Sequence, residues 1–236
     1  MWTEKLYWDK QEGEKKSMVK SVGWNWKEEK SNIWKNPCEE SYYYCQKWLG
    51  EGRKKVLDLG CGLGRHAILF AANGLEVTAV DLSEDAIASV KAWQAECGLE
   101  FPAMQMDMQH MDFADNTFDC IWSYMVVSHT DTQGFANLIK ELERILKPGG
   151  QIFITLCSKD DSIFKRGGAR IIDENTIIKS NEGSEKDVPH FYMNMEDIQK
   201  AFGNFVLNRV RHIDNCCYDG KPNENKHYFV EATLKA

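Results

Sequence analysis

Residues 56–66 read VLDLGCGLGRH and place three glycines, Gly60, Gly62 and Gly64, two positions apart. Glycine lets a backbone come close to a ligand that a Cβ atom would repel. Asp58 stands two residues before the first glycine, where its carboxylate could meet an ammonium group. The same carboxylate would repel a pyrophosphate in a desolvated site, and the GxGxxG spacing of dinucleotide sites is absent. The turn therefore favours a cationic ligand without phosphate.

Two further acids follow at intervals that suit a nucleoside. Asp81 lies 21 positions after Gly60, a distance at which an acid can accept both hydroxyls of a ribose. Asp107, together with the backbone of Met108, can face an adenine amino group. Each acid alone fits a loop start or a helix cap equally well. Together the three acids predict recognition of an ammonium, a ribose and an adenine, which S-adenosylmethionine offers without a phosphate.

The chain around these residues alternates short apolar runs with helix-period stretches, which predicts a parallel sheet covered by helices on both faces. In such a sheet the ligand binds at the carboxyl ends of the strands. The expected strands are 54–60, 75–83, 102–107, 118–129 and 151–157, and the expected helices are 64–74, 84–98 and 135–150.

The pattern changes after residue 158. Residues 158–189 are polar and weakly periodic, which predicts a long connection with a short strand or two. A short helix is expected over 195–203. Strands over 205–213 and 227–234 have no long helix between them, so we expect an antiparallel hairpin at one edge of the sheet.

Residues 1–52 differ in composition from the rest, since they hold six of the eight tryptophans. We expect them to form a helical or irregular extension laid over a domain that covers 53–236. The aromatic side chains could anchor this extension, which we favour for most of them. One or two near residues 24–44 could instead help to close a pocket, in a lid formed by Trp24, Trp26 and Trp34 with Tyr42, Tyr43 and Tyr44.

Residues 54–157 resemble the class I S-adenosylmethionine-dependent methyltransferases, through DLGCGLGRH, VTAVDLS, MQMDMQ and the KPGG turn that precedes the fifth strand. The resemblance implies a doubly wound, Rossmann-like α/β fold. Its seven-stranded sheet would be mostly parallel, in the order 3-2-1-4-5-7-6, with an antiparallel C-terminal hairpin. It also implies an enzyme, a transferase that takes a methyl group from S-adenosylmethionine.

The resemblance carries the binding residues over one by one. The glycine turn and its acid correspond to the methionine end of the cofactor, Asp81 to the ribose and Asp107 to the adenine. The cofactor-binding residues expected in this way are Asp58, Leu59, Gly60, Cys61, Gly62, Gly64, Arg65, Asp81, Leu82, Asp107, Met108, Gln109 and Ser123.

Methyl transfer requires the nucleophile to be aligned with the methyl group and can require a base. His129 follows the fourth strand and is the candidate base, and the alternative is that it caps a loop or packs on the next helix. Tyr124 is expected near the sulfonium, with its ring or its hydroxyl. His190, with Phe191 and Tyr192, is either a wall of the acceptor pocket or part of a surface loop.

Charge bears on the methyl acceptor. The chain has 29 basic and 36 acidic residues, a net charge of −7, which argues against nucleic acid and anionic membranes as partners. We therefore expect a small-molecule acceptor. The oligomeric state that we expect is a monomer or a homodimer. An RNA or protein methyltransferase is the alternative, although SYMV replaces the NPPY tetrapeptide of enzymes that methylate amino groups of nucleic acids. A non-catalytic S-adenosylmethionine-binding protein also remains open, and a nicotinamide dehydrogenase is least favoured.

The eight cysteines form no CxxC pair, which predicts reduced thiols and no metal site. Cys216 and Cys217 could hold a soft metalloid acceptor or have no role of that kind. No apolar run reaches the ~18–20 residues of a membrane span. The charged N-terminal segment does not have the pattern of a secretory signal, so we expect a cytoplasmic protein.

Overall fold

The computed structural model describes residues 19–29, 31–166, 170–180, 182–214 and 225–236, and Cys216 and Cys217 lie outside them. The main sheet has the order β3-β2-β1-β4-β5-β10-β9, and only β10 runs against the others. Its strands are β1 (Lys55–Leu59), β2 (Glu76–Asp81), β3 (Ala103–Gln105), β4 (Phe118–Ser123), β5 (Leu146–Ser158), β9 (Phe205–Asp214) and β10 (Lys226–Leu234). The predicted doubly wound α/β fold, its strand order and its C-terminal hairpin are confirmed.

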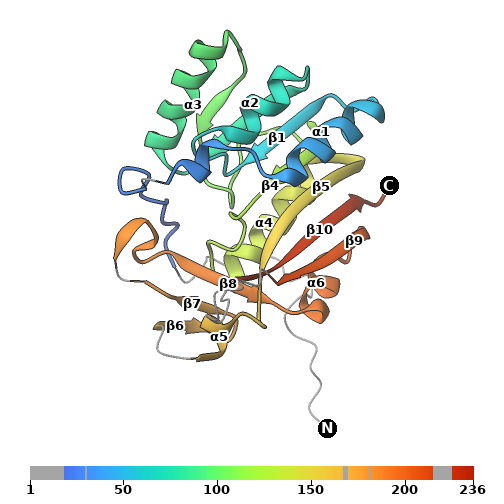
Figure 1. Ribbon diagram of the computed structural model, residues 1–236. Helices are drawn as coiled ribbons and strands as arrows, with labels where there is room; N and C mark the ends of the chain where they lie inside the picture. Colours follow the sequence, from blue (N-terminus) through green and yellow to red (C-terminus); the bar gives the residue numbers. More distant parts are fainter. Residues whose placement is uncertain (1–18, 30, 167–169, 181, 215–224) are drawn as a thin grey trace.

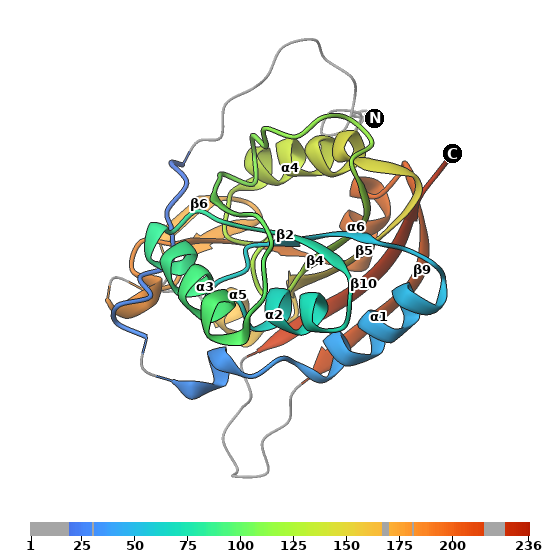
Figure 2. The same cartoon turned by 90° about the horizontal axis from the view of Figure 1, so that it is seen from above.

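Helices cover both faces of this sheet (Figures 1 and 2). One face carries α1 (Glu39–Gly50), α2 (Arg65–Ala72) and α3 (Glu84–Cys97), and the other carries α4 (Thr132–Ile145) and α6 (Met195–Ala201). Each face has its own buried apolar cluster. In the described part of the chain, no helix has the length and apolar character needed to span a membrane.

Local signals set most of these boundaries. Ser83 caps α3 by accepting a hydrogen bond from the Ala86 N–H, and Gly98 ends the helix in the left-handed conformation. The fourth strand is shorter than predicted: it ends at Ser123 rather than 129, because the chain turns at Met125, whose φ is +61°. The third strand likewise covers 103–105 instead of 102–107.

The segment after β5 builds a small additional sheet at the carboxyl end of the main one. It contains α5 (Ser162–Arg166), β6 (Arg170–Asp173), β7 (Thr176–Ile178), the 3-10 turn η2 (Gly183–Glu185) and β8 (Pro189–Met193). β8 pairs in parallel with the last residues of β5, β7 pairs antiparallel with β8, and β6 pairs antiparallel with β7. The three strands, absent from the predicted seven, lie across the end of the sheet where a ligand is expected (Figure 1).

The N-terminal part of the chain is attached by α1. Trp48 is fully buried against Phe70, and Tyr44 packs on Phe153 with ring centroids 4.5 Å apart. Upstream, residues 19–29 and 31–35 run past the carboxyl ends of the strands and include the 3-10 turn η1 (Asn32–Lys35). We call these residues the N-terminal strap. Anchoring thus falls to α1, while the strap lies over the expected site.

Candidate active site

The turn between β1 and α2 depends on its glycines. Gly60 and Gly62 have φ values of +70° and +53°, which side chains rarely adopt. A Cβ on Gly60 would lie 2.3 Å from the Val126 side chain, and one on Gly62 would lie 2.7 Å from the Trp26 ring. Gly64 caps α2 at φ +99°. Backbone thus forms the floor of the site, with aromatic and aliphatic side chains directly above it.

Asp81, the last residue of β2, lies beside the glycine turn and forms an adjacent wall of the site. Its Oδ2 accepts a hydrogen bond from the Gly62 N–H and its Oδ1 accepts one from the Ser83 N–H, both at 2.9 Å. Burial raises the pKa of this carboxyl, while the backbone N–H donors counteract the rise. Each oxygen keeps a lone pair for a further donor. The carboxylate is therefore held in place and can still accept hydrogen bonds from a ligand.

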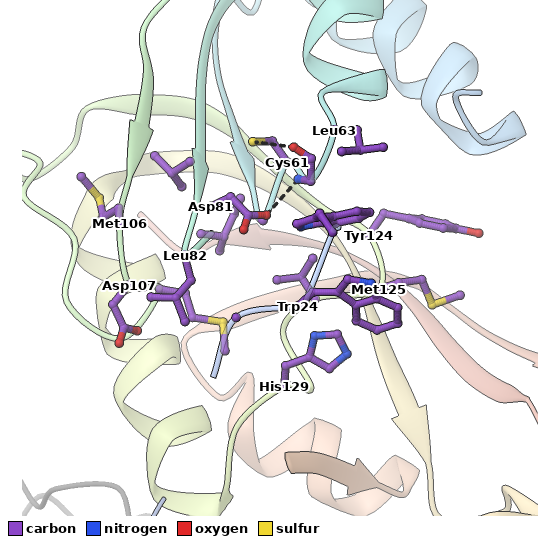
Figure 3. A pocket seen from close by; sticks show the side chains of 18 of the residues that line it. Trp24, Cys61, Leu63, Asp81, Leu82, Met106, Asp107, Tyr124, Met125 and His129 are labelled. Carbon is purple, nitrogen blue, oxygen red and sulfur yellow. Dashed lines mark hydrogen bonds between the residues drawn. The ribbon is translucent and has the colours of Figure 1, made fainter. Parts of the chain in front are cut away.

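Asp107 follows β3 on the same edge, and its Oδ1 accepts the Gln109 N–H at 2.9 Å. Figure 3 shows Asp81 and Asp107 on one side of a cavity, with Trp24, Met125 and His129 on the other. We call this space the first cavity. The site residues predicted from the sequence that do line this cavity are Leu59, Gly60, Cys61, Gly62, Arg65, Asp81, Leu82, Asp107, Met108, Tyr124 and His129.

Four of the predicted binding residues do not line the first cavity, namely Asp58, Gly64, Gln109 and Ser123. Ser123 donates to the Leu59 carbonyl at 2.8 Å, and the Gln109 amide donates to Ser21 in the strap at 3.1 Å. These two side chains therefore hold the walls in place from behind.

Asp58 lies beneath the glycine turn, 1% exposed, rather than facing the cavity as the sequence suggested. It accepts a hydrogen bond from the Ala67 N–H in α2. Its Oδ2 has no hydrogen-bond partner among the described residues. Burial raises the pKa of this carboxyl to about 7. A direct contact between Asp58 and an ammonium group is not part of this geometry.

The strap closes the cavity with three tryptophans, more than the one or two expected. Trp24, Trp26 and Trp34 pack against one another with ring centroids 5.8–6.0 Å apart. The indole nitrogens of Trp24 and Trp26 are buried and have no partner in the described part of the chain, so their N–H groups are available to a ligand. The three tyrosines assigned to the same lid do not join it: Tyr42 and Tyr43 are exposed, and Tyr44 belongs to the core.

Arg65 contributes a guanidinium group to the first cavity, and the N–H groups of that guanidinium donate hydrogen bonds to other parts of the chain. It donates hydrogen bonds to the carbonyls of Ile33 and Asn36, at 2.9 and 3.0 Å. Its plane lies over the rings of Trp34 and Tyr124, 5.0 and 5.5 Å from the centroids. The contacts fasten the strap to α2. An anionic phosphate would have to displace them, so the cavity suits a ligand without phosphate.

The two residues predicted to assist catalysis both reach the first cavity. Tyr124 stacks on Trp122, and burial raises the pKa of its hydroxyl, which stays neutral. His129 lies between Trp24 and His190, with ring centroids 5.8 and 5.0 Å away. Desolvation, followed by the neighbouring His190 and Lys179, lowers the pKa of His129 to about 3. Such an imidazole stays neutral and accepts hydrogen bonds, but it is a weak base.

A second cavity adjoins the first. Trp24, Trp34, Met125 and His129 line both, so they form the wall between them. The second cavity is otherwise lined by Ser128, Thr155, Cys157, Lys179, Glu185, His190, Asn225 and His227. His190 is thus a pocket residue, as one of the two predicted alternatives held, whereas Phe191 packs on Phe135 and Tyr192 on Phe164. Among the described residues, no three His, Cys, Asp or Glu side chains gather as a metal site.

Sequence reasoning missed most of this second lining. Apart from the wall shared with the first cavity, its residues come from the segment after β4, from β5, from the additional sheet with η2, and from β10 and the residue before it. The outermost two, Ser128 and His227, are 99 positions apart in the chain. In the first cavity, Ser21, Val22, Gly23, Leu63, His66, Val80, Met106, Met125 and Val126 were also missed. Proximity to the glycine motif could have indicated Leu63 and His66, but no motif marks the others.

Comparison with known proteins relates part of the chain to methyltransferases. Residues 56–150 match a family model described as a methyltransferase domain. A malonyl-[acyl-carrier protein] O-methyltransferase from Enterobacter lignolyticus is 35% identical over 120 residues, 51% of this chain and 45% of that protein. A ubiquinone biosynthesis O-methyltransferase from Pseudomonas aeruginosa is 29% identical over 116 residues, 49% of each protein. The matched part thus covers about half the length of these relatives.

Solved structures share the fold over more of the chain. A SAM-dependent methyltransferase from Methanosarcina mazei has a TM-score of 0.68 at 17% identity, covering 85% of this chain and 99% of that one. A 1,6-didemethyltoxoflavin-N1-methyltransferase from Burkholderia thailandensis has a TM-score of 0.61 at 15% identity, covering 84% and 78%. The latter was crystallised with 1,6-didemethyltoxoflavin and S-adenosylhomocysteine.

Proposed function

Because residues 56–150 match a methyltransferase domain, we propose that the chain is a class I S-adenosylmethionine-dependent methyltransferase. It would transfer a methyl group from S-adenosylmethionine, bound in the first cavity, to a small molecule bound in the second. One observation carries the proposal: a glycine turn and two strand-end carboxylates surround a cavity whose guanidinium is already hydrogen-bonded to the chain. The similarity to methyltransferases of small molecules supports it.

The residues present fit the cofactor group by group. Asp81 would accept the ribose hydroxyls, and Asp107 with the Met108 backbone would hold the adenine. The backbone of Gly60 and Gly62 would face the methionine end, because only glycine leaves room there. When bound, S-adenosylmethionine supplies a methyl group on a positively charged sulfur. Asp58 and Ser123 would act from behind, by fixing the turn and the end of β4.

The shared wall determines where the acceptor must approach. Trp24, Met125 and His129 face both cavities, so a nucleophile in the second cavity meets the first one beside them. The tryptophans exclude water, and their ring faces favour positive charge by roughly 0.5–2 kcal/mol each. The neutral imidazole of His129 would accept a hydrogen bond from the acceptor and so orient it.

Calorimetric titration of S-adenosylmethionine, S-adenosylhomocysteine and NAD into the purified protein tests the cofactor. We expect binding of the two sulfur compounds and none of NAD. Asp81→Asn should weaken S-adenosylmethionine binding by about 1–3 kcal/mol, because one acceptor oxygen is lost. Asp112→Asn, at an exposed carboxyl outside the cavity, is the matched control. Wild-type affinity in a folded Asp81→Asn variant would contradict the placement of the ribose.

A further inference from the structure

The second cavity contains a buried imidazole with an unused nitrogen. Nε2 of His190 has no hydrogen-bond partner in the described part of the chain, although the residue is 1% exposed. Buried polar atoms in proteins are nearly always paired, so an unpaired one that lines a cavity points to a ligand. The other ring nitrogen, Nδ1, lies 3.0 Å from the carbonyl oxygen of Val188. A carbonyl only accepts, so Nδ1 carries the proton and Nε2 presents its lone pair.

A carboxylate stands where it would stabilise the protonated ring. Glu185 Oε1 lies 3.6 Å from Nε2 of His190, and Glu185 Oε2 is held by Lys179 Nζ at 3.1 Å. Burial raises the pKa of Glu185, but the neighbouring Lys179 ammonium outweighs this and lowers it, so the group is ionised. Burial lowers the pKa of His190, which is therefore neutral before reaction. After the ring takes up a proton, each of its N–H groups would face a hydrogen-bond acceptor: the Val188 carbonyl for Nδ1 and the Glu185 carboxylate for Nε2.

The remaining groups around His190 leave the cavity without net charge. It faces His129 after β4, Cys157 on β5, Lys179 after β7, Glu185 in η2 and His227 on β10. Lys179 and Glu185 compensate each other. Burial lowers the pKa of His227 to about 4 and raises that of the Cys157 thiol to about 11, so both are neutral. A carboxylate or phosphate ligand would find no uncompensated cation here.

We infer that the second cavity takes a small, polar, uncharged methyl acceptor that reacts through an N–H or O–H group, and that Nε2 of His190 takes up its proton. This inference rests on the proposed function. In the step, the nitrogen or oxygen of the acceptor forms a bond to the methyl carbon, and the bond from that carbon to sulfur breaks with its electron pair left on sulfur. The proton of the acceptor passes to Nε2, and Glu185 stabilises the resulting imidazolium.

Two substitutions separate the roles of base and anion. His190→Asn removes Nε2, while the new amide can still donate to the Val188 carbonyl. Glu185→Gln keeps the size and removes the charge. His110→Asn and Glu182→Gln are the matched controls, since both residues are exposed and line neither cavity. The probe acceptors are imidazole and catechol, which carry N–H and O–H groups, malonate as an anion, and dimethyl sulfide, which has no proton to lose.

Formation of S-adenosylhomocysteine is measured for each variant, with calorimetry of S-adenosylmethionine alongside. Transfer to imidazole or catechol should fall 10²- to 10⁴-fold in His190→Asn, with the cofactor affinity within twofold of wild type. In Glu185→Gln, the acidic limb of the kcat profile should move to lower pH. Wild-type transfer by His190→Asn overturns the inference. So does preference for malonate or dimethyl sulfide, or no transfer to any of the four acceptors by a protein that binds the cofactor.

A second readout needs no turnover. In ¹⁵N-histidine NMR spectra, the His190 signals are those missing from His190→Asn. We expect an unprotonated Nε2 at pH 7.5, and a lower His190 pKa in Glu185→Gln but not in Glu182→Gln. A protonated Nε2, or a pKa insensitive to Glu185, contradicts the assignment of His190. Failure of wild-type protein to bind S-adenosylmethionine is a different result, which overturns the proposed function and this inference with it.

Discussion

The indole of Trp24 stacks on the imidazole of His129, with ring centroids 5.8 Å apart and an interplanar angle of 28°. Trp24 belongs to the N-terminal strap and His129 follows β4, so the pair joins segments about a hundred positions apart. Both residues line both cavities. The stacked pair therefore forms the wall at which the proposed methyl transfer takes place.

Removal of this wall should weaken cofactor binding. Trp24→Ala loses the stacking on His129 and the indole N–H, and aromatic pairs are worth about 0.5–1.5 kcal/mol beyond their buried area. We expect S-adenosylmethionine affinity to fall by at least that amount in calorimetry, and by less in Trp24→Phe, which keeps a ring. Tyr42→Ala, at an exposed ring of α1, should bind like wild type. Equal affinity of Trp24→Ala and wild type would show that the strap does not contact the cofactor.

A comparison of alanine substitutions at Gly60 and Gly149 separates the cost of a left-handed backbone conformation from the cost of a steric clash. Their φ values are +70° and +73°, but a Cβ at Gly149 meets nothing within 4 Å. Gly149→Ala should cost about 1–2 kcal/mol of unfolding free energy in urea, the cost of a left-handed alanine. Gly60→Ala should cost about 1–3 kcal/mol more, because its Cβ overlaps Val126. Val126→Ala should recover part of that difference, and equal losses in the two single variants would refute the close approach.

Asp58 should make the protein less stable as the pH rises. Its folded pKa of about 7 lies above the ordinary pKa of 3.8 for an aspartic acid side chain, so the folded state binds the extra proton between these values. The contribution of Asp58 to stability is therefore complete below pH 4 and falls by up to about 1.4 kcal/mol per pH unit toward pH 7. Urea unfolding from pH 4.5 to 7.5 should show a smaller fall in Asp58→Asn. Parallel curves for the two proteins would mean that Asp58 is ionised throughout.

His129 should have the opposite effect. Its folded pKa of about 3 lies below the ordinary pKa of 6.5 for a histidine side chain, so the unfolded state binds the extra proton between them. The contribution of His129 to stability is complete above pH 6.5 and is lost as the pH falls toward 3. His129→Asn should therefore lose less stability than wild type between pH 7 and pH 4.5. An NMR titration that shows His129 protonated at pH 6 would disprove the burial effect.

The fold, and the glycine turn and two strand-end acids of the first cavity, could be predicted because local signals determine them. The glycines need positive φ values, Ser83 caps a helix, and Asp81 and Asp107 end strands that a parallel sheet brings to one edge. The inward direction of Asp58 could not be predicted, since a strand-end carboxyl can turn toward the ligand or toward the next helix. Only packing of α2 decides it.

The second cavity could not be predicted for a different reason. Lys179, Glu185 and His227 meet His190 only because β8 adds to β5 and the hairpin places β10 on the other side of β5. These pairings connect distant segments with weak local patterns. The sequence indicated His190 as one of two alternatives and gave no sign of Glu185.

The strap is tied at both ends of the site. Arg65 holds the carbonyls of Ile33 and Asn36 over the first cavity, and the Asn25 N–H donates to the Ser184 carbonyl, 3.2 Å away, beside Glu185. One segment thus borders both ligands. Any displacement of the strap that admits or releases one ligand also loosens the enclosure of the other, so the kinetics of cofactor exchange and acceptor exchange are linked through a single covering element.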